Sequence, residues 1–304
     1  MSAHAPVSVT EYTDPGCVVA WASEPRLRLL RLRYGHLVDW RRVFGLQIAD
    51  ALATDPGFHP ERSAQAHLER WTEVARATGA PITGHLHWTH RSTGPASRAV
   101  ISARRQGPVV ADRVLRRLRE ALYLDGRPAD SPGRLRGALA GVPGLDIGGL
   151  LAGLDTDRAH SVLRAEAAEA RRVHPATGQA ARAGSTPYPG PPVADGAEHR
   201  YAFPTLLFSS AGRTVVLPGY RSVEEYEAAL SDLWPGITEE ARPLPSAEEL
   251  LAAHGTLTGP EVDLLAGGRP PRGALRTPTA NGDVWRPAAD PAAAPARSAE
   301  GAAR

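Results

Sequence analysis

The chain has 304 residues, of which 42% are hydrophobic, so it can bury one large core or two ordinary ones. Its single cysteine excludes an internal disulfide. The formal net charge is only +2 and every basic side chain is arginine, a coding bias that gives little reason to expect nucleic-acid binding. No apolar run has membrane-spanning length and no signal peptide is recognisable, so we expect a soluble cytoplasmic protein without membrane contact.

The first 45 residues predict a strand, a helix and a second strand. Residues 7–13 (VSVTEYT) alternate and are β-branched, as in a strand, and Asp14-Pro15-Gly16 is typical of a turn. A helical pattern then runs from Cys17 to about Gly35, with Pro25 expected to kink or restart it. Residues 36–45 indicate the second strand, and the three elements together predict a βαβ unit with parallel strands.

A long helical block follows. Segments between residues 56 and 173 carry apolar side chains three and four positions apart, which predicts amphipathic helices. Residues 174–197 are rich in Pro, Gly and Ala and lack this periodicity, so we expect a flexible loop there.

Strand character returns in residues 200–220, where two β-rich runs flank the turn SSAGR and predict an antiparallel hairpin. Ser222 and Glu225 form a capping-box pattern at the start of a helix over 222–234. Residues 237–287 predict a small appendage with two short helices, a turn and a short strand. The low-complexity tail, 288–304, is expected to be disordered.

This order of elements predicts a thioredoxin-like α/β fold with a mixed four-stranded sheet. Residues 1–55 and 198–236 would form the thioredoxin-like domain, 56–173 an α-helical insertion, and 237–287 the C-terminal appendage. The cysteine lies where the first strand passes into the first helix, and Pro204 begins the hairpin.

The motif TDPGCVVAWASEP resembles the first-helix pattern of the DsbA family of thioredoxin-fold proteins. Similarity continues in YGHLVDWRRVFGL, in the segment from STGPASRAV to LYLDGR, and in FPTLLF and VLPGY, so that it covers most of residues 7–234. The cytoplasmic branch of that family, with its protease adaptors and dithiol-isomerase-like proteins, is the most similar. The second cysteine of the family pattern falls on Ala20, which excludes self-contained dithiol catalysis because nothing can release a mixed disulfide from Cys17.

The resemblance implies a site around Cys17. A thiol at a helix N-terminus is expected to have a lowered pKa, and Cys17 would be the catalytic residue. Pro204 would be the cis-proline facing it, and Phe203, Thr205 and Trp21 would complete a substrate-binding groove. The alternatives are a small buried hydrophobic side chain for Cys17, a trans peptide bond before Pro204, and a core position for Trp21.

Two functions therefore remain. The first is a thiol-disulfide oxidoreductase reduced to one thiol, which exchanges with a low-molecular-weight thiol as co-substrate and needs no other cofactor. The alternative is a redox-inactive adaptor that binds a protein partner in the groove near Cys17 and Pro204.

Other sequence patterns give weaker indications of function. His85, His87 and His90 lack the spacing of a metal site, and a solvated loop anchored by Trp88 is expected. Neither a serine-nucleophile elbow nor a phosphate-binding loop is found. The appendage has the outline of a helix–helix–wing unit, but two prolines in RPPRGALRTPT interrupt the region where a recognition helix would lie, so we do not expect nucleic-acid binding.

Overall fold

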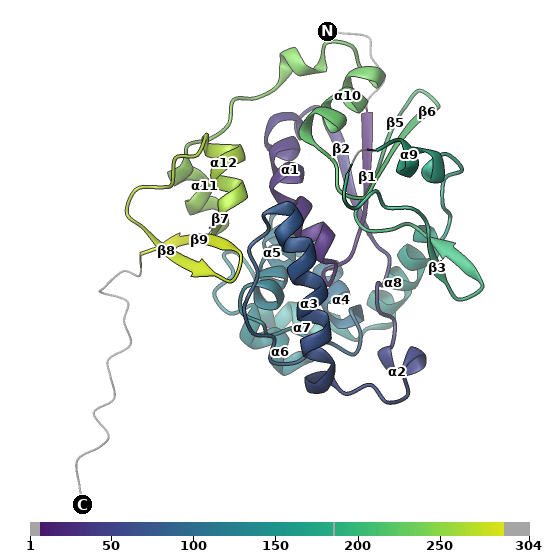
Figure 1. Ribbon diagram of the computed structural model, residues 1–304, viewed down its shortest axis with the longest axis vertical. Coiled ribbons are helices and arrows are strands. Elements are labelled where there is room, and N and C mark those ends of the chain that lie inside the picture. The colour runs from purple at the N-terminus through teal and green to yellow at the C-terminus, as the bar shows by residue number, and fades with distance from the viewer. Residues whose placement is uncertain (1–6, 185, 289–304) are drawn as a thin grey trace, which may run out of the picture.

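The computed structural model describes residues 7–184 and 186–288 (Figure 1). In this part of the chain, no helix is both long and apolar enough to cross a lipid bilayer. The expected disordered tail lies, from residue 289 onward, outside the described residues.

A four-stranded mixed sheet lies at the centre, in the order β2-β1-β5-β6. Strands β1 and β2 are parallel, whereas β5 is antiparallel to both of its neighbours. The sheet and its two associated helices comprise β1 (Val7–Thr13), α1 (Val18–Tyr34), β2 (Val38–Phe44), β5 (Thr205–Ser210), β6 (Arg213–Pro218) and α10 (Val223–Leu233). The predicted thioredoxin-like fold is confirmed.

Local signals place these elements where the sequence predicts them. Alternate residues of β1, Val7 and Val9, are buried in one cluster with Leu30 of α1 and Tyr226 of α10, so both helices cover the same face of the sheet. The capping box at the start of α10 forms as predicted. Helix α1 continues through Pro25 as a single helix, so the expected restart is wrong.

The chain from β2 to residue 173 is helical, as the sequence predicts for residues 56–173. Its helices are α2 (Ala51–Thr54), α3 (Pro60–Thr78), α4 (Gly94–Ala103), the 3-10 turn η1 (Arg104–Gln106), α5 (Pro108–Tyr123), α6 (Pro132–Ala138), α7 (Ile147–Leu154) and α8 (Asp157–Ala170). These helices share an apolar core with Phe44 of β2, in which Val114 and Leu118 of α5 lie among Leu135 and Leu150. The three-and-four spacing of apolar residues explains why α5 buries one face there.

The segment 174–197 contains regular structure, contrary to the expected loop. It holds helix α9 (Thr177–Ala183) and strand β3 (Val193–Asp195), which pairs with β4 (Glu198–Arg200). Thr177 and Ala181 are buried. The sequence did not predict α9, because a helix of two turns has few apolar positions and therefore shows only weak periodicity. Mobility of this segment stays a prediction.

The C-terminal appendage is a compact unit beside α1 (Figure 1). It follows the 3-10 turn η2 (Ile237–Glu240) and contains α11 (Ala247–His254), β7 (Leu257–Thr258), α12 (Gly259–Ala266), β8 (Ala274–Thr279) and β9 (Gly282–Pro287). Its three strands are ordered β7-β9-β8. Leu29 of α1 is buried with Leu250 and Val262 of the unit. The two helices and β9 agree with the sequence, whereas β7 and β8, which contains Pro278, were not predicted.

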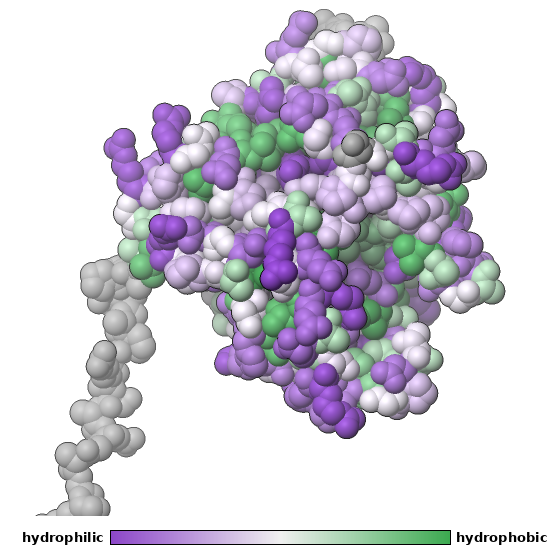
Figure 2. All heavy atoms as spheres, viewed as in Figure 1, coloured by the Kyte–Doolittle hydropathy of each residue, from purple (hydrophilic) through white to green (hydrophobic). Residues whose placement is uncertain are grey.

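The surface carries both polar and apolar side chains. The face in Figure 2 is largely polar, with apolar patches that are small and separate. Among the described residues, the large apolar side chains that are exposed are Val109, Val193 and Leu275.

Candidate thiol site at the first helix

The turn before α1 is held by a buried carboxylate. Asp14 accepts hydrogen bonds from the backbone N–H of Gly16 at 2.7 Å and of Gln47 at 2.8 Å, and from Thr93 Oγ1 at 2.8 Å. Burial raises the pKa of Asp14, although these hydrogen bonds act in the opposite direction. The turn, the loop after β2 and the insertion are thereby joined directly before Cys17.

Cys17 is the N-cap residue of α1, and its thiol is buried, with 6% of the residue exposed. The Sγ atom donates a hydrogen bond to the carbonyl oxygen of Phe203 at 3.1 Å. Burial raises the pKa of the thiol to about 11, and this outweighs the backbone N–H groups of Ala20 and Val19, which favour the thiolate. The expected lowering of this pKa is therefore wrong, because desolvation exceeds the effect of the helix terminus.

Cys17 and Pro204 do lie together, as the resemblance implies. The Phe203–Pro204 peptide bond is cis, so the trans alternative is wrong. Thr205 is fully buried, and its hydroxyl donates to the carbonyl oxygen of Ala202 at 2.7 Å. Phe203 is only 6% exposed. Phe203 and Thr205, two of the residues proposed to bind substrate, thus face the protein interior.

The chain between α8 and β5 packs against Cys17. Tyr201 stacks on Tyr12 with ring centroids 4.3 Å apart, and its backbone N–H donates to the carbonyl oxygen of Ala170 at 3.0 Å. Phe203 lies over Gly45, where a Cβ atom would approach the Phe203 ring to 2.2 Å. These aromatic side chains share one buried cluster with Cys17.

Trp21 lies in the core, with 2% of the residue exposed. Its indole N–H donates to the carbonyl oxygen of Pro81 at 2.9 Å, and its ring stacks on Tyr123 with centroids 5.8 Å apart. The core alternative given for Trp21 agrees with this position. Ala20 is fully buried beside Cys17, where the family pattern has the second cysteine.

A buried ion network lies behind the site, which the sequence did not reveal. Arg119 of α5 donates to Glu24 of α1 at 2.7 Å and to Thr13 Oγ1 at 2.9 Å, and its side chain is fully buried. Burial raises the pKa of Glu24, but nearby guanidinium groups, first that of Arg31, hold it well below its ordinary value. These partners are separated by 95 residues in the chain, and no local pattern predicts such a pair.

The sequence also did not predict the burial of two polar groups beside the Asp14 turn. The Nε2 atom of His90 and the hydroxyl of Tyr123 have no hydrogen-bond partner among the described residues. Burial lowers the pKa of His90 to about 4, so its imidazole is neutral at pH 7. The expected solvated loop is therefore wrong at His90, although Trp88 does anchor it through a hydrogen bond to the carbonyl of Pro128. Within the described ranges, no group of three or more acidic, histidine or cysteine side chains could hold a metal.

The sheet order, the helices between β2 and β5, and the thiol beside a cis-proline define a thioredoxin-like fold, in agreement with the resemblance to the DsbA family found in the sequence. The ClpXP adapter protein SpxH of Shouchella clausii is 24% identical over 268 residues, which cover 87% of this chain and 79% of that protein. The protein of the same name from Halalkalibacterium halodurans is 28% identical over 123 residues, and that alignment covers 40% of each chain.

A solved structure from Nitrosomonas europaea, provisionally assigned as a protein disulfide isomerase, superimposes with a TM-score of 0.52. It is 21% identical, and the superposition covers 75% of this chain and 95% of that one, which supports the fold alone. No family model matches the chain. The adapter relatives agree with the adaptor-like branch suggested by the sequence.

Proposed function

We propose that this protein is a redox-inactive adaptor, which uses the thioredoxin fold as a scaffold for binding another protein. The observation that carries this proposal is the state of Cys17: its thiol is buried, donates a hydrogen bond to the Phe203 carbonyl and has a raised pKa. The name of the relative that aligns over most of the chain, a ClpXP adapter, supports the same function and suggests the partner class.

The chemistry of the site explains why we prefer the adaptor to the monothiol enzyme. With a pKa of about 11, on the order of one thiol in ten thousand is ionised at pH 7, and only the thiolate attacks a disulfide. The position where a resolving thiol would lie is Ala20. Tyr201 and Phe203 share one buried cluster with Cys17, so a partner would reach the thiol only after they move. We therefore place partner binding on the outer surface, and the groove location expected from the sequence becomes the less favoured alternative. We also propose that the protein is located in the cytoplasm.

The test is direct binding of the full chain to purified ClpXP from the same organism, measured by bio-layer interferometry. Wild type and Cys17→Ala should bind with dissociation constants that agree within about twofold, because the buried thiol contributes no surface. A chain that binds neither ClpXP nor ClpX alone would overturn this partner. Binding that requires Cys17 would overturn the redox-inactive part of the proposal.

The second candidate is monothiol exchange, which is favoured by one observation: Cys17 lies at the N-terminus of α1 opposite cis-Pro204, the reactive arrangement of the fold. Cys17 would attack a mixed disulfide between a protein and a small thiol. The protein would leave as a thiolate, and Cys17 would become bound to the small thiol. A second small thiol would then regenerate Cys17 and be released as the oxidised disulfide.

A turnover assay separates the two candidates. With glutathione and a glutathionylated peptide as substrate, exchange should give multiple turnovers with wild type and none with Cys17→Ser. Equal background rates for both proteins support the adaptor.

A further inference from the structure

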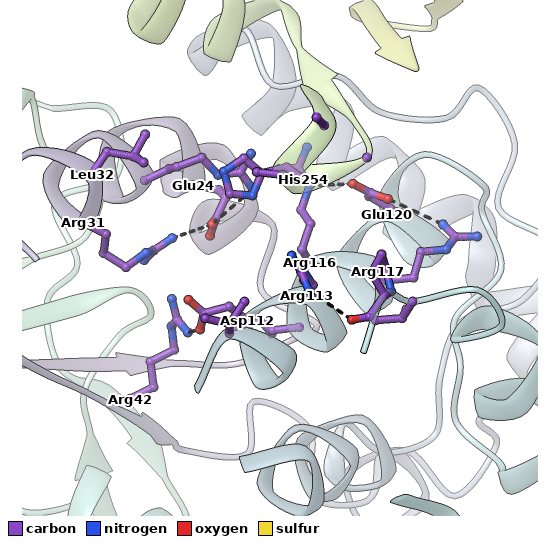
Figure 3. Close-up of a pocket in the computed structure, with 18 residues that line it drawn as sticks. Glu24, Arg31, Leu32, Arg42, Asp112, Arg113, Arg116, Arg117, Glu120 and His254 are labelled. Carbon is purple, nitrogen blue, oxygen red and sulfur yellow. Dashed lines mark hydrogen bonds and ion pairs between the residues drawn. The ribbon is translucent and has the colours of Figure 1, made fainter. Parts of the chain in front are cut away.

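A cavity of about 320 Å³ lies where three parts of the molecule meet, away from Cys17. Its walls come from α1 and β2 of the thioredoxin-like part, from α5 of the insertion, and from the end of α11 in the C-terminal unit (Figure 3). This volume is at the lower end of the range for small-molecule sites, and such sites favour junctions between domains. Nothing in the proposed function uses this cavity.

The cavity wall is rich in guanidinium groups. Six arginines line it: Arg28, Arg31, Arg42, Arg113, Arg116 and Arg117. Three carboxylates line it with them, namely Glu24, Asp112 and Glu120, and two more, Glu11 and Glu261, pair with these arginines from behind the wall. The cationic groups thus exceed the anionic ones at the cavity surface.

Some of these guanidinium groups are fully engaged. Arg116 donates to Glu120 at 2.6 Å, to both oxygens of Glu261 at 3.0 Å, and to Thr256 Oγ1 at 3.2 Å. Arg42 pairs with Glu11 and Asp112. These side chains hold the three parts of the molecule together and have little capacity left for a ligand.

Arg31 and Arg113 differ in how their donors are used. Arg31 donates through Nη2 to Glu24 at 2.7 Å, and its buried Nη1 forms an ion pair with Glu11 at 3.6 Å, so this side chain adds positive charge to the wall without a free donor. Arg113 donates to the backbone carbonyl of Pro143 at 3.1 Å and pairs with no carboxylate among the described residues. Its remaining N–H groups are therefore available to donate charge-assisted hydrogen bonds to an anion in the cavity.

The rest of the lining is apolar. Leu32, Leu115 and Val142 contribute aliphatic surface, and Val109 at the cavity is 58% exposed. An apolar group in the cavity would cover this surface and gain about 25 cal/mol for each Å² removed from water. The lining therefore suits a ligand with both a charged head and an apolar body.

His254, the last residue of α11, is directed toward the cavity (Figure 3). Burial, with a further contribution from Arg28, lowers the pKa of its imidazole to about 3. The ring is neutral at pH 7, so it can donate one hydrogen bond to an anion.

We propose that this cavity is a binding site for a small amphipathic carboxylate. The unused donors of Arg113 bind the carboxylate group, and the aliphatic wall around Leu32 and Leu115 holds the apolar body. Because the walls belong to α1, α5 and α11, the bound molecule contacts all three parts of the chain and stabilises the docked position of the C-terminal unit.

Isothermal titration calorimetry of the full chain with hexanoate tests the proposal, with 1-hexanol and acetate as matched controls. Hexanoate should bind with one site per chain and raise the melting temperature, and hexanol and acetate should each bind at least about tenfold more weakly. Arg113→Gln should weaken hexanoate binding about tenfold, because it removes hydrogen bonds to a charged group. Ala252→Phe, which adds a ring to the cavity wall, should abolish binding. Arg213→Gln, on an exposed arginine of β6, is the matched control and should bind as wild type does.

Four results would overturn the inference. Absence of saturable hexanoate binding to wild type excludes the site. Equal affinity for hexanol shows an apolar void without anion recognition, and equal affinity for acetate shows that the aliphatic wall does not contribute. Binding unaffected by both Arg113→Gln and Ala252→Phe places the carboxylate elsewhere on the molecule.

Discussion

The thiol of Cys17 donates its hydrogen to the backbone carbonyl of Phe203, with 3.1 Å between sulfur and oxygen. The two residues are 186 positions apart, and the contact directs the thiol into the protein at the position where DsbA-type proteins carry their reactive sulfur. The hydrogen bond favours the neutral thiol, since a thiolate has no proton to donate. Reactivity at this site therefore depends on the segment that carries Phe203.

Alkylation of Cys17 by iodoacetamide should be slow in the folded protein. At pH 7.5 we expect a rate at least about a hundredfold below that of a free thiol, because the raised pKa leaves little thiolate and the side chain is buried. The rate should still be rising at pH 10. The control is Ser161→Cys in a Cys17→Ala background, which places a thiol at an exposed position of α8. A titration midpoint near or below 8.5 for Cys17 would contradict the structure.

Gly45→Ala should destabilise the protein and make the thiol of Cys17 more accessible. The added Cβ would lie 2.2 Å from the ring of Phe203 and 3.0 Å from Ala170, so the side chain of Phe203 must move. We expect a loss of about 1 to 3 kcal/mol in the free energy of unfolding, measured with urea, and faster alkylation of Cys17.

The matched control is Gly137→Ala in α6, where an added Cβ meets no atom within 4 Å. This substitution should stabilise the protein by up to about 1 kcal/mol, because alanine is the better helix former. Unchanged stability and unchanged alkylation in Gly45→Ala would show that Phe203 does not cover the thiol as described.

Arg119→Met should be among the most destabilising single substitutions. The fully buried guanidinium pairs with Glu24 and Thr13, and its removal leaves a buried carboxylate with less compensation. A loss of about 3 kcal/mol is expected from urea denaturation. Arg213→Met removes an exposed ion pair with Asp232 and should change stability by no more than about 0.5 kcal/mol. Similar losses in both variants would show that burial of the Arg119 network contributes nothing.

His90 should make the protein less stable in mild acid. Its folded-state pKa is about 4, below the unfolded value of about 6.5, so the unfolded chain binds the proton first as the pH falls. The stability from this group is present above pH 6.5 and is lost toward pH 4, with a decrease of about 2 kcal/mol between pH 7 and pH 5. Its titratable neighbours His67 and Asp130 act in opposite directions.

Urea midpoints at pH 7, 6 and 5 measure this effect. His90→Gln should show a smaller decrease than wild type, and His85→Gln, at an exposed position, should follow wild type. Parallel curves for all three proteins would mean that His90 is not buried in its neutral form.

The sequence by itself determined the order of the central elements and the position of the thiol along them. Strand β1, the Asp14 turn, helix α1 and the capping box at Ser222 are local features, since their signals lie within a few residues of the structure they produce. The resemblance that paired Cys17 with cis-Pro204 combined several such local motifs in one order.

Only the tertiary structure decided whether the thiol is exposed. A helix N-terminus lowers a thiol pKa when water reaches it, but Tyr201 and Phe203 cover Cys17 and desolvation then exceeds the effect of the terminus. The buried ion pair of Arg119 with Glu24 and the cavity between α1, α5 and α11 have the same origin. Each depends on side chains that are distant in the chain and meet only when the core packs, so no local pattern could reveal them.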